Sequence, residues 1–295
     1  MKTLRMYCSI IFITIFSINA KIIETNNFEI ISQYADKDTL VLFDIDNTLA
    51  RPESELGSDE WFCYMIDQKI AHGYDKSSAM TAVLPLSYYA LFNVPLVVTD
   101  LIVPVLLKNL TTRGIYTMGL TSRGPFLAER TYDQLINIDI NFMMPPSATE
   151  TALQLENPLL YKYAILFVGN NDKGDALLLF LDTIGYHPSS IIFIDDKMSH
   201  VQSVEKAAIS RNINYIGIRY SGCDTYINHF DPAKADMQLH QLQQKNRKPA
   251  QQYKNSTPTN ALSCWYYYLL LFLIASLVFV LLSQFFFKPH RKHRK

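Results

Sequence analysis

Apolar residues recur along this chain in short blocks that alternate with longer amphipathic segments. The blocks end at polar residues, have the length of buried strands, and cover residues 39–43, 115–120, 164–168, 190–194 and 215–218. Amphipathic segments typical of helices lie at 100–113, 174–183 and 199–210. This alternation predicts an α/β domain with a mainly parallel sheet, which we place at residues 21–240.

The stretch between the first two predicted strands, about residues 49–99, is too long for a simple crossover. Ser58, followed by two acidic residues, is a predicted N-cap for a helix over 61–72. A second helical pattern over 77–91 is interrupted at Pro85. We interpret this insertion as a helical cap that covers a site.

Each end of the chain carries a separate apolar run. In residues 1–20, Lys2 and Arg5 precede the apolar run and small residues follow it. This is the layout of a signal peptide cleaved after Ala20, with an uncleaved anchor as the alternative. Residues 265–287 carry no charge and would extend over about 35 Å as a helix, so they are a predicted transmembrane helix.

The segments beside the predicted membrane helix set the expected topology. Residues 241–264 form a polar linker, and the basic tail at 288–295 is expected in the cytoplasm. With an exported N-terminus, the α/β domain then lies outside the cytoplasm, on the periplasmic side of the inner membrane in a bacterium. The lipid bilayer is a predicted partner through residues 265–287.

Composition narrows the class of protein. The chain is 49% hydrophobic, which excludes overall disorder, and 27 basic residues balance 27 acidic ones, so nothing indicates a nucleic-acid partner. The seven histidines show no metal-ligand spacing, and His200 is expected to be solvated. For Cys63 and Cys223, a disulfide and two buried thiols are both open.

A pair of aspartates directly follows the predicted strand at 39–43. In Asp44-x-Asp46-x-Thr48, the first two residues can converge on one phosphate where the strand gives way to a loop. One carboxylate would serve as a nucleophile and the other as general acid and base. Taken alone, the motif also fits a turn with solvated aspartates.

Three further polar positions lie at strand ends or at a helix start. Thr121 follows the strand at 115–120 and offers a hydroxyl to a phosphoryl oxygen. Lys173, at a helix start where it opposes the helix dipole, is a candidate for offsetting phosphate charge. Asp195 and Asp196 end the strand at 190–194, and their mutual repulsion favours a hard cation such as Mg²⁺.

These elements, in this order, resemble the haloacid dehalogenase (HAD) superfamily over about residues 39–218. The chain is more closely similar to an uncharacterised HAD-like family from intracellular bacterial pathogens. The resemblance implies a Rossmann-like three-layer sandwich with a helical cap after the first strand. It further implies Asp44 as the nucleophile that forms an aspartyl phosphate, Asp46 as acid and base, Thr121 and Lys173 as phosphate-site residues, and Mg²⁺ at Asp44, Asp46, Asp195 and Asp196. Asn47 departs from the glycine frequent at its position.

The predicted function is therefore an exported, membrane-anchored, magnesium-dependent phosphohydrolase acting on a phosphoester. A non-catalytic HAD-fold binding protein and a phosphotransferase are the alternatives. The substrate would be selected by the cap, where Tyr88, Tyr89 and Phe92 are candidates for contacts with an organic leaving group, although such aromatic residues also suit a core.

Overall fold

The computed structural model describes residues 19–254, with side chains to residue 246. Within the described part, residues 19–240 belong to one compact unit. No helix in the described part is long and apolar enough to cross a membrane. The predicted membrane helix at 265–287, the tail at 288–295 and all but two residues of the predicted signal peptide lie outside the described residues.

A mixed sheet forms the centre of the unit. Its eight strands, in spatial order, are β1 (Ala20–Thr25), β10 (Asn214–Tyr220), β9 (Ser190–Asp195), β2 (Thr39–Phe43), β5 (Tyr116–Thr121), β8 (Ile165–Phe167), β7 (Pro158–Lys162) and β6 (Thr151–Gln154). The six strands from β1 to β8 are parallel, and β7 and β6 extend the sheet antiparallel. The predicted α/β class with a mainly parallel sheet is confirmed.

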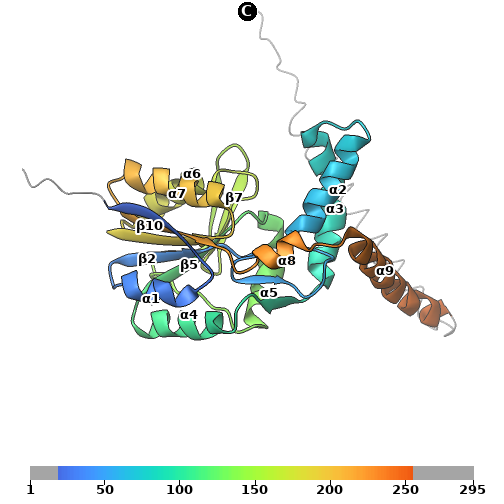
Figure 1. The fold of residues 1–295 in the computed structure, drawn as a ribbon, viewed down its shortest axis with the longest axis horizontal. Helices are drawn as coiled ribbons and strands as arrows, with labels where there is room; N and C mark the ends of the chain where they lie inside the picture. Colours follow the sequence, from blue (N-terminus) through green and yellow to red (C-terminus); the bar gives the residue numbers. More distant parts are fainter. Residues whose placement is uncertain (1–18, 255–295) are drawn as a thin grey trace, which may run out of the picture. The chain divides into compact units, whose positions relative to one another are not determined.

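Helices cover both faces of this sheet, as Figure 1 shows for α6 and α7 on one face and α1 and α4 on the other. The helices of the described part are α1 (Ile31–Tyr34), α2 (Asp59–Ala71), α3 (Lys76–Asn93), α4 (Ile102–Thr112), α5 (Ala128–Ile136), α6 (Lys173–Ile184), α7 (Met198–Ser210), α8 (Asp224–Asn228) and α9 (Pro232–Lys254), with 3₁₀ turns at Phe28–Ile30 and Pro125–Leu127. All residues of β2 are buried because alternate side chains enter the two cores between sheet and helices. The three-layer arrangement follows directly from this pattern.

The order of the strands fixes where a ligand site can form. From β2 the chain builds β5 and β8 on one side, and then returns through α6 to build β9 and β10 on the other side. A crevice opens at the carboxyl end of the strands where the direction of building reverses, here between β2 and β9. Phe43 pairs with Ile194, so Asp44, which follows β2, and Asp195, the last residue of β9, lie side by side at this edge.

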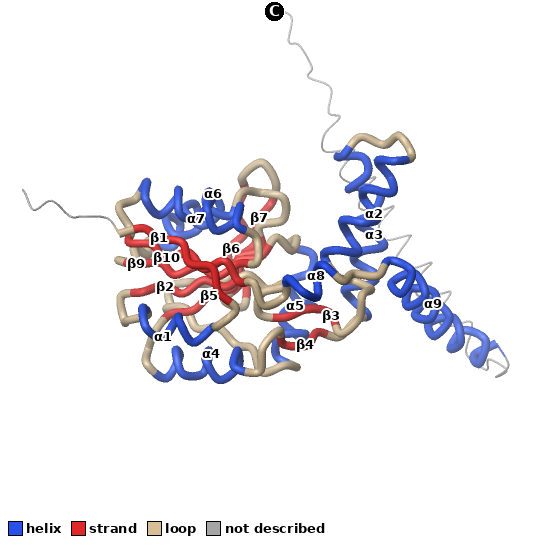
Figure 2. Tube along the Cα trace, viewed as in Figure 1, coloured by secondary structure: helices blue, strands red, loops and turns tan. Residues whose placement is uncertain are grey.

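The insertion after β2 is a helical hairpin on a small two-stranded base. Helices α2 and α3 form the hairpin, and β3 (Ala50–Pro52) pairs antiparallel with β4 (Leu96–Val98) below them (Figure 2). Ser58 caps α2, since its hydroxyl accepts a hydrogen bond from the Trp61 amide at 3.1 Å. We refer to residues 50–98 as the cap.

Some local features differ from what the hydrophobic pattern predicts. Helix α3 runs through Pro85, where an interruption was predicted, because Val83 and Ser87 are buried on either side of the proline and hold both halves of the helix. The sheet also has strands that the hydrophobic pattern did not predict, namely β1 and the β6–β7 extension. Helix α9 continues to Lys254, into the segment expected to be a polar linker.

We predict that Gly174→Ala destabilises the domain. A Cβ at Gly174 would lie 2.5 Å from the backbone oxygen of Ser203 in α7, so the α6–α7 contact has to open. Such overpacking costs about 1–3 kcal/mol, which outweighs the gain of about 1 kcal/mol that alanine normally brings to a helix. The free energy of unfolding in urea should fall by roughly 1–2 kcal/mol. Thr183→Ala, at an exposed position of the same helix, should change it by less than about 0.5 kcal/mol.

Candidate active site

Asn47 and Thr48, in the loop after β2, are held by contacts with other parts of the chain. Asn47 has φ of 57°, a left-handed conformation that glycine favours and asparagine tolerates, which explains why asparagine can stand at this position. Its side-chain amide donates to Glu60 of the cap at 2.8 Å. The Thr48 hydroxyl accepts from the backbone amide of Asp196 at 3.0 Å. These contacts join the loop to the cap and to the end of β9.

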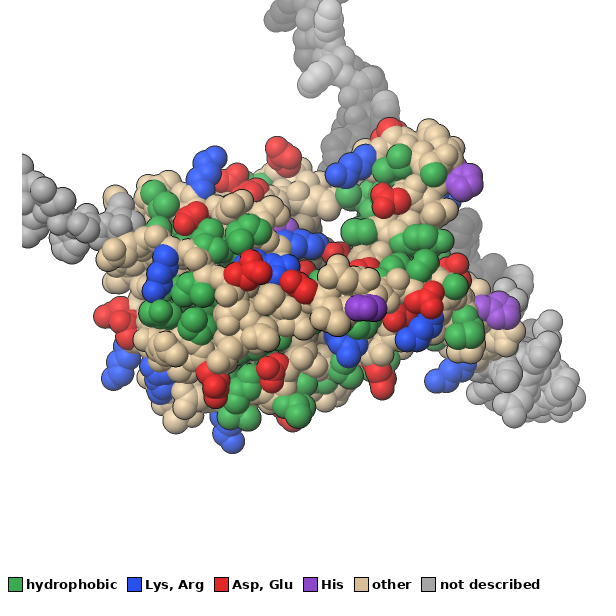
Figure 3. Space-filling model, viewed as in Figure 1, with side chains coloured by type: hydrophobic (Ala, Val, Ile, Leu, Met, Phe, Trp, Pro, Cys, Tyr) green, Lys and Arg blue, Asp and Glu red, His purple; other side chains and the backbone are tan. Residues whose placement is uncertain are grey.

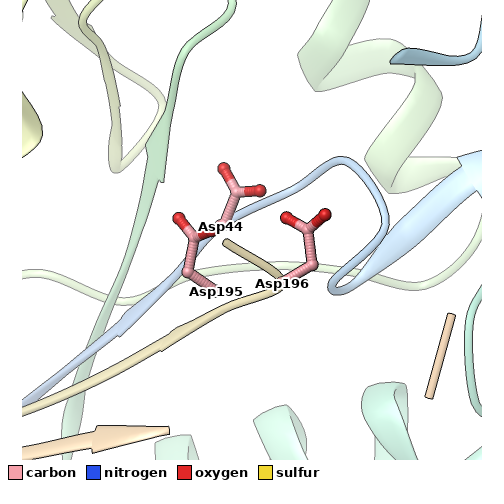
Figure 4. A group of neighbouring side chains, drawn as sticks. All are labelled: Asp44, Asp195 and Asp196. Atoms are coloured by element: carbon pink, nitrogen blue, oxygen red, sulfur yellow. The ribbon is translucent and has the colours of Figure 1, made fainter. Parts of the chain in front are cut away.

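Three buried aspartates converge where β2 and β9 end. Asp44, Asp195 and Asp196 each place a carboxylate oxygen within 4.8 Å of the other two. Figure 4 shows Asp44 leaving one strand and the other two leaving its neighbour, with all three carboxylates on the same side. The carboxylate cluster thus contains three of the six residues predicted from sequence to form the site.

Lys173 joins two of these carboxylates. Its ammonium lies 2.6 Å from Asp44 Oδ1 and 2.7 Å from Asp195 Oδ2, and its side chain is 1% exposed. A lysine in the first turn of α6 is therefore explained by the charge it faces. Even when only Asp44 and Asp195 are ionised, the cluster carries more negative charge than one ammonium offsets.

Burial and mutual repulsion shift the pKa values in this cluster. Burial, opposed by Lys173, raises the pKa of Asp44 to about 6. Asp196 does not share in the Lys173 ion pairs, and burial with repulsion from Asp44 and Asp195 raises its pKa to about 9. The pKa of Asp195 falls to about 2, because Lys173 and the contact with His200 outweigh its burial.

Asp46 is held in a different environment from the other aspartates. Arg123 donates two hydrogen bonds to its carboxylate, from Nε at 2.8 Å and from a terminal nitrogen at 2.7 Å. This bidentate pairing keeps the pKa of Asp46 below its usual value despite burial. The remaining terminal nitrogen of Arg123 donates to Thr131 and Gln134, both at 3.0 Å. The sequence pattern assigned no role to Arg123.

Thr121 ends β5, the strand next to β2, and is 1% exposed. Its hydroxyl accepts a hydrogen bond from the Arg123 amide at 3.1 Å, which leaves the hydroxyl proton available. The geometry is that of a buried hydroxyl at the carboxyl edge of the sheet, as predicted.

Two side chains at the start of α7 complete the site, and sequence reasoning missed both. His200 was expected to be solvated, but its Nδ1 lies 3.1 Å and 3.0 Å from the two carboxylate oxygens of Asp195. The helix begins three residues after the end of β9, so its first turn folds back over Asp195. Lys197 reaches the cap, where it pairs with Asp59 at 2.6 Å.

The cysteines do not pair with each other. Cys63 is an exposed free thiol in the cap, and Cys223 is a buried free thiol in the core. The disulfide alternative is wrong for the described fold, and of the two expected buried thiols only one is buried.

A cavity of about 460 Å³ opens beside Asp46, between the cap and the loops after β5 and β8. The residues that line it are Asp46, Gly57, Ser58, Asp59, Phe62, Leu84, Ser87, Tyr88, Leu91, Ser122, Arg123, Gly124, Pro125, Leu127, Asn157, Pro158, Gly169 and Asn170. Tyr88 is among them, whereas Tyr89 and Phe92, also expected to contact a leaving group, are not.

The acidic cluster fits a hard divalent cation. All its donor atoms are carboxylate oxygens, which Mg²⁺ prefers, and the cluster carries more negative charge than Lys173 offsets. The carboxylates of Asp44, Asp195 and Asp196 could hold such a cation.

The fold and this site define an α/β protein with a buried carboxylate centre at the switch point of a parallel sheet. Residues 24–256 match the family described as "Protein of unknown function (DUF2608)", and the chain belongs to that family. A Chlamydia pneumoniae protein named "Putative outer membrane protein" is 22% identical over 238 residues, covering 76% of this chain and 86% of its own length. A Chlamydia trachomatis protein of the same name is 25% identical over 190 residues, covering 64% and 71%. Among solved structures, a haloacid dehalogenase-like hydrolase from Streptococcus pneumoniae matches 65% of this chain and 98% of its own, at 14% identity and a TM-score of 0.38.

We predict that, in a chelator, the domain becomes less stable as pH rises between about 5 and 8. The unfolded chain releases the Asp196 proton near its ordinary pKa of 3.8, whereas the folded chain keeps that proton until about 9. The unfolded state therefore binds fewer protons over this window, and stability falls by up to about 1.4 kcal/mol per pH unit.

The measurement is urea unfolding at pH 5.5 and pH 8, for the wild type and for Asp196→Asn. The asparagine cannot ionise, so the variant should lose most of the pH dependence. Equal slopes for the two proteins would contradict the assignment of this proton to Asp196.

Proposed function

We propose that the protein is a magnesium-dependent phosphohydrolase of the haloacid dehalogenase type that acts through an aspartyl phosphate on Asp44. The observation that carries the proposal is the convergence of Asp44, Asp195, Asp196 and Lys173 at the switch point of the sheet. A buried trio of carboxylates with one lysine has no evident role in stability, because each buried charge is costly. It suits a site that binds a phosphate and a cation.

In the first step, an oxygen of the Asp44 carboxylate attacks the phosphorus of a phosphomonoester. The bond between phosphorus and the leaving oxygen breaks, and that oxygen takes a proton from Asp46 to leave as an alcohol. In the second step, water attacks the phosphorus of the aspartyl phosphate while Asp46 takes a proton from it. The acyl phosphate bond breaks, and inorganic phosphate and the Asp44 carboxylate are released.

The surrounding residues position and balance these charges. Lys173 holds the Asp44 carboxylate in place and offsets the charge of the phosphoryl group. The Thr121 hydroxyl, which accepts a hydrogen bond from the Arg123 amide, would donate its proton to a phosphoryl oxygen. Mg²⁺, held by the carboxylates of Asp44, Asp195 and Asp196 and in the HAD pattern by the Asp46 carbonyl, would supply electrostatic stabilisation of the transferring phosphoryl group.

The pairing of Asp46 with Arg123 favours its role as a base. A carboxylate with a lowered pKa is ionised at neutral pH and can accept a proton from water. The same pairing makes protonated Asp46 scarce, so esters whose leaving oxygen needs a proton should react best under acidic conditions.

The chain is further proposed to be exported and held at a membrane. The support is the arrangement of residues 1–20 and 265–287 in the sequence, together with relatives named as outer membrane proteins. In this proposal the catalytic domain, residues 21–240, acts outside the cytoplasm. The family would then be the HAD-like family of intracellular bacterial pathogens that the sequence resembles. A phosphotransferase would use the same residues with an alcohol in place of water.

We predict that Asp44→Asn abolishes phosphate release from p-nitrophenyl phosphate by the full-length protein. The amide is a poor nucleophile and cannot form the acyl phosphate, so the rate should fall by about 10³-fold or more. The wild type should need added Mg²⁺ and lose activity in a chelator.

Asp67→Asn, at an exposed position of α2, is the matched control and should keep wild-type activity. Equal phosphate release by the wild type and Asp44→Asn would contradict the mechanism. A folded wild type that releases no phosphate from any phosphoester would favour the non-catalytic binding protein.

We predict that Arg123→Lys shifts the alkaline limb of the pH profile of kcat/KM to higher pH with an alkyl phosphate. Lysine cannot make the bidentate contact, so the pKa of Asp46 rises and its protonated form persists at higher pH. With p-nitrophenyl phosphate, whose leaving group needs no proton, the limb should stay in place. If the alkaline limb shifted equally with both substrates, the shift would come from Asp44 or from a change in the fold, and not from Asp46.

A further inference from the structure

The cavity beside Asp46 has walls that are mostly apolar. The cap contributes Phe62 from α2 and Leu84, Tyr88 and Leu91 from α3. Leu127 belongs to the 3₁₀ turn after β5 that also borders the space. At about 460 Å³ the cavity has the size of a small-molecule site.

Aromatic contacts hold the cap against the body at the edge of this cavity. The ring of Phe126, in the same turn as Leu127, lies 5.6 Å from that of Tyr88 and 5.7 Å from that of Phe92, measured between centroids. Phe126 is nonetheless 69% exposed. Apolar surface therefore continues from the cavity wall to the solvent.

Every charged side chain that lines the cavity is already paired. Asp46 and Arg123 bind each other through two hydrogen bonds, and Asp59 binds Lys197. All three guanidinium nitrogens of Arg123 donate to protein oxygens, and the residue is 5% exposed. Among the described residues that line the cavity, none offers an unpaired cation.

This balance determines which leaving group fits. A second phosphate or a carboxylate on the substrate would lose its hydration without gaining a cationic partner. It would also lie near the carboxylates of Asp46 and Asp59, so binding of such a substrate would be disfavoured. The uncharged polar side chains along the wall, Ser58, Ser87, Ser122, Asn157 and Asn170, suit hydroxyl or amide groups. The face of the protein in Figure 3 likewise shows acidic and basic side chains interspersed, with no field of one sign.

We propose that the substrate is a phosphomonoester of an uncharged alcohol or phenol with an apolar, ring-sized body, which lies against Tyr88 and Leu84. This inference rests on the proposed phosphohydrolase function. It adds that the cap selects against esters that carry a second anionic group.

The test compares two esters that differ by one charge. Phenyl phosphate and 3-carboxyphenyl phosphate are assayed with the full-length protein and Mg²⁺, and kcat/KM is measured for each. The uncharged ester should be favoured by about tenfold or more.

A cation placed in the cavity should change this preference. In Leu84→Lys, an ammonium on the cavity wall can pair with the added carboxylate, so the ratio of the two kcat/KM values should fall by about tenfold. Asn170→Lys places an ammonium on an exposed loop that also lines the cavity, and it leaves α3 unchanged. It should lower the same ratio. Leu86→Lys, on the same helix but outside the cavity lining, is the matched control and should leave the ratio unchanged.

The outcomes separate the inference from the function on which it rests. Hydrolysis of both esters at equal kcat/KM, or a preference for the carboxylated ester, overturns the inference and leaves the phosphohydrolase standing. An unchanged ratio in both Leu84→Lys and Asn170→Lys also overturns it, because the cavity then does not hold the leaving group. Hydrolysis of neither ester, by a folded protein, overturns both.

Discussion

The buried ammonium of Lys173 between Asp44 and Asp195 is the interaction on which the site depends. Three buried carboxylates at the ends of adjacent strands repel one another when they are ionised. One lysine, delivered by the first turn of α6, offsets part of this charge and bridges the side chains at the ends of the paired strands β2 and β9. The close packing of α6 on α7 at Gly174 keeps that lysine in position.

The cap is connected to this centre by polar contacts as well as by the chain. Asn47 hydrogen-bonds to Glu60, and Lys197, next to the acidic cluster, pairs with Asp59. Both cap residues lie in the first turn of α2, so movement of that helix would be felt by the loop after Asp44 and by the start of α7. The first turn of α2 therefore links the cavity, which Asp59 lines, to the residues that flank the carboxylates.

The candidate site residues that could be predicted from the sequence are those next to the end of a strand or the start of a helix. Asp44, Lys173 and the Asp195–Asp196 pair were found because each follows an apolar run or opens a helix. Arg123 was not assigned because its partner Asp46 is far away in sequence, and no local pattern reports such a pair. Strand β1 was missed for the same reason, because it forms by pairing with β10, far away in sequence. In addition, buried and exposed side chains alternate only weakly along it.

In the proposed mechanism, the charges of the site divide it into two environments with different tasks. On the side of β9, carboxylates exceed cations, so that side favours a metal ion with the phosphoryl group. On the side of the cap, every charge that lines the cavity is paired, so that side favours an uncharged organic group. Asp46 lies at the boundary, where the bond between phosphorus and the leaving oxygen would be. Because Arg123 binds Asp46 on this boundary, it sets the proton affinity of the group that has to serve both sides.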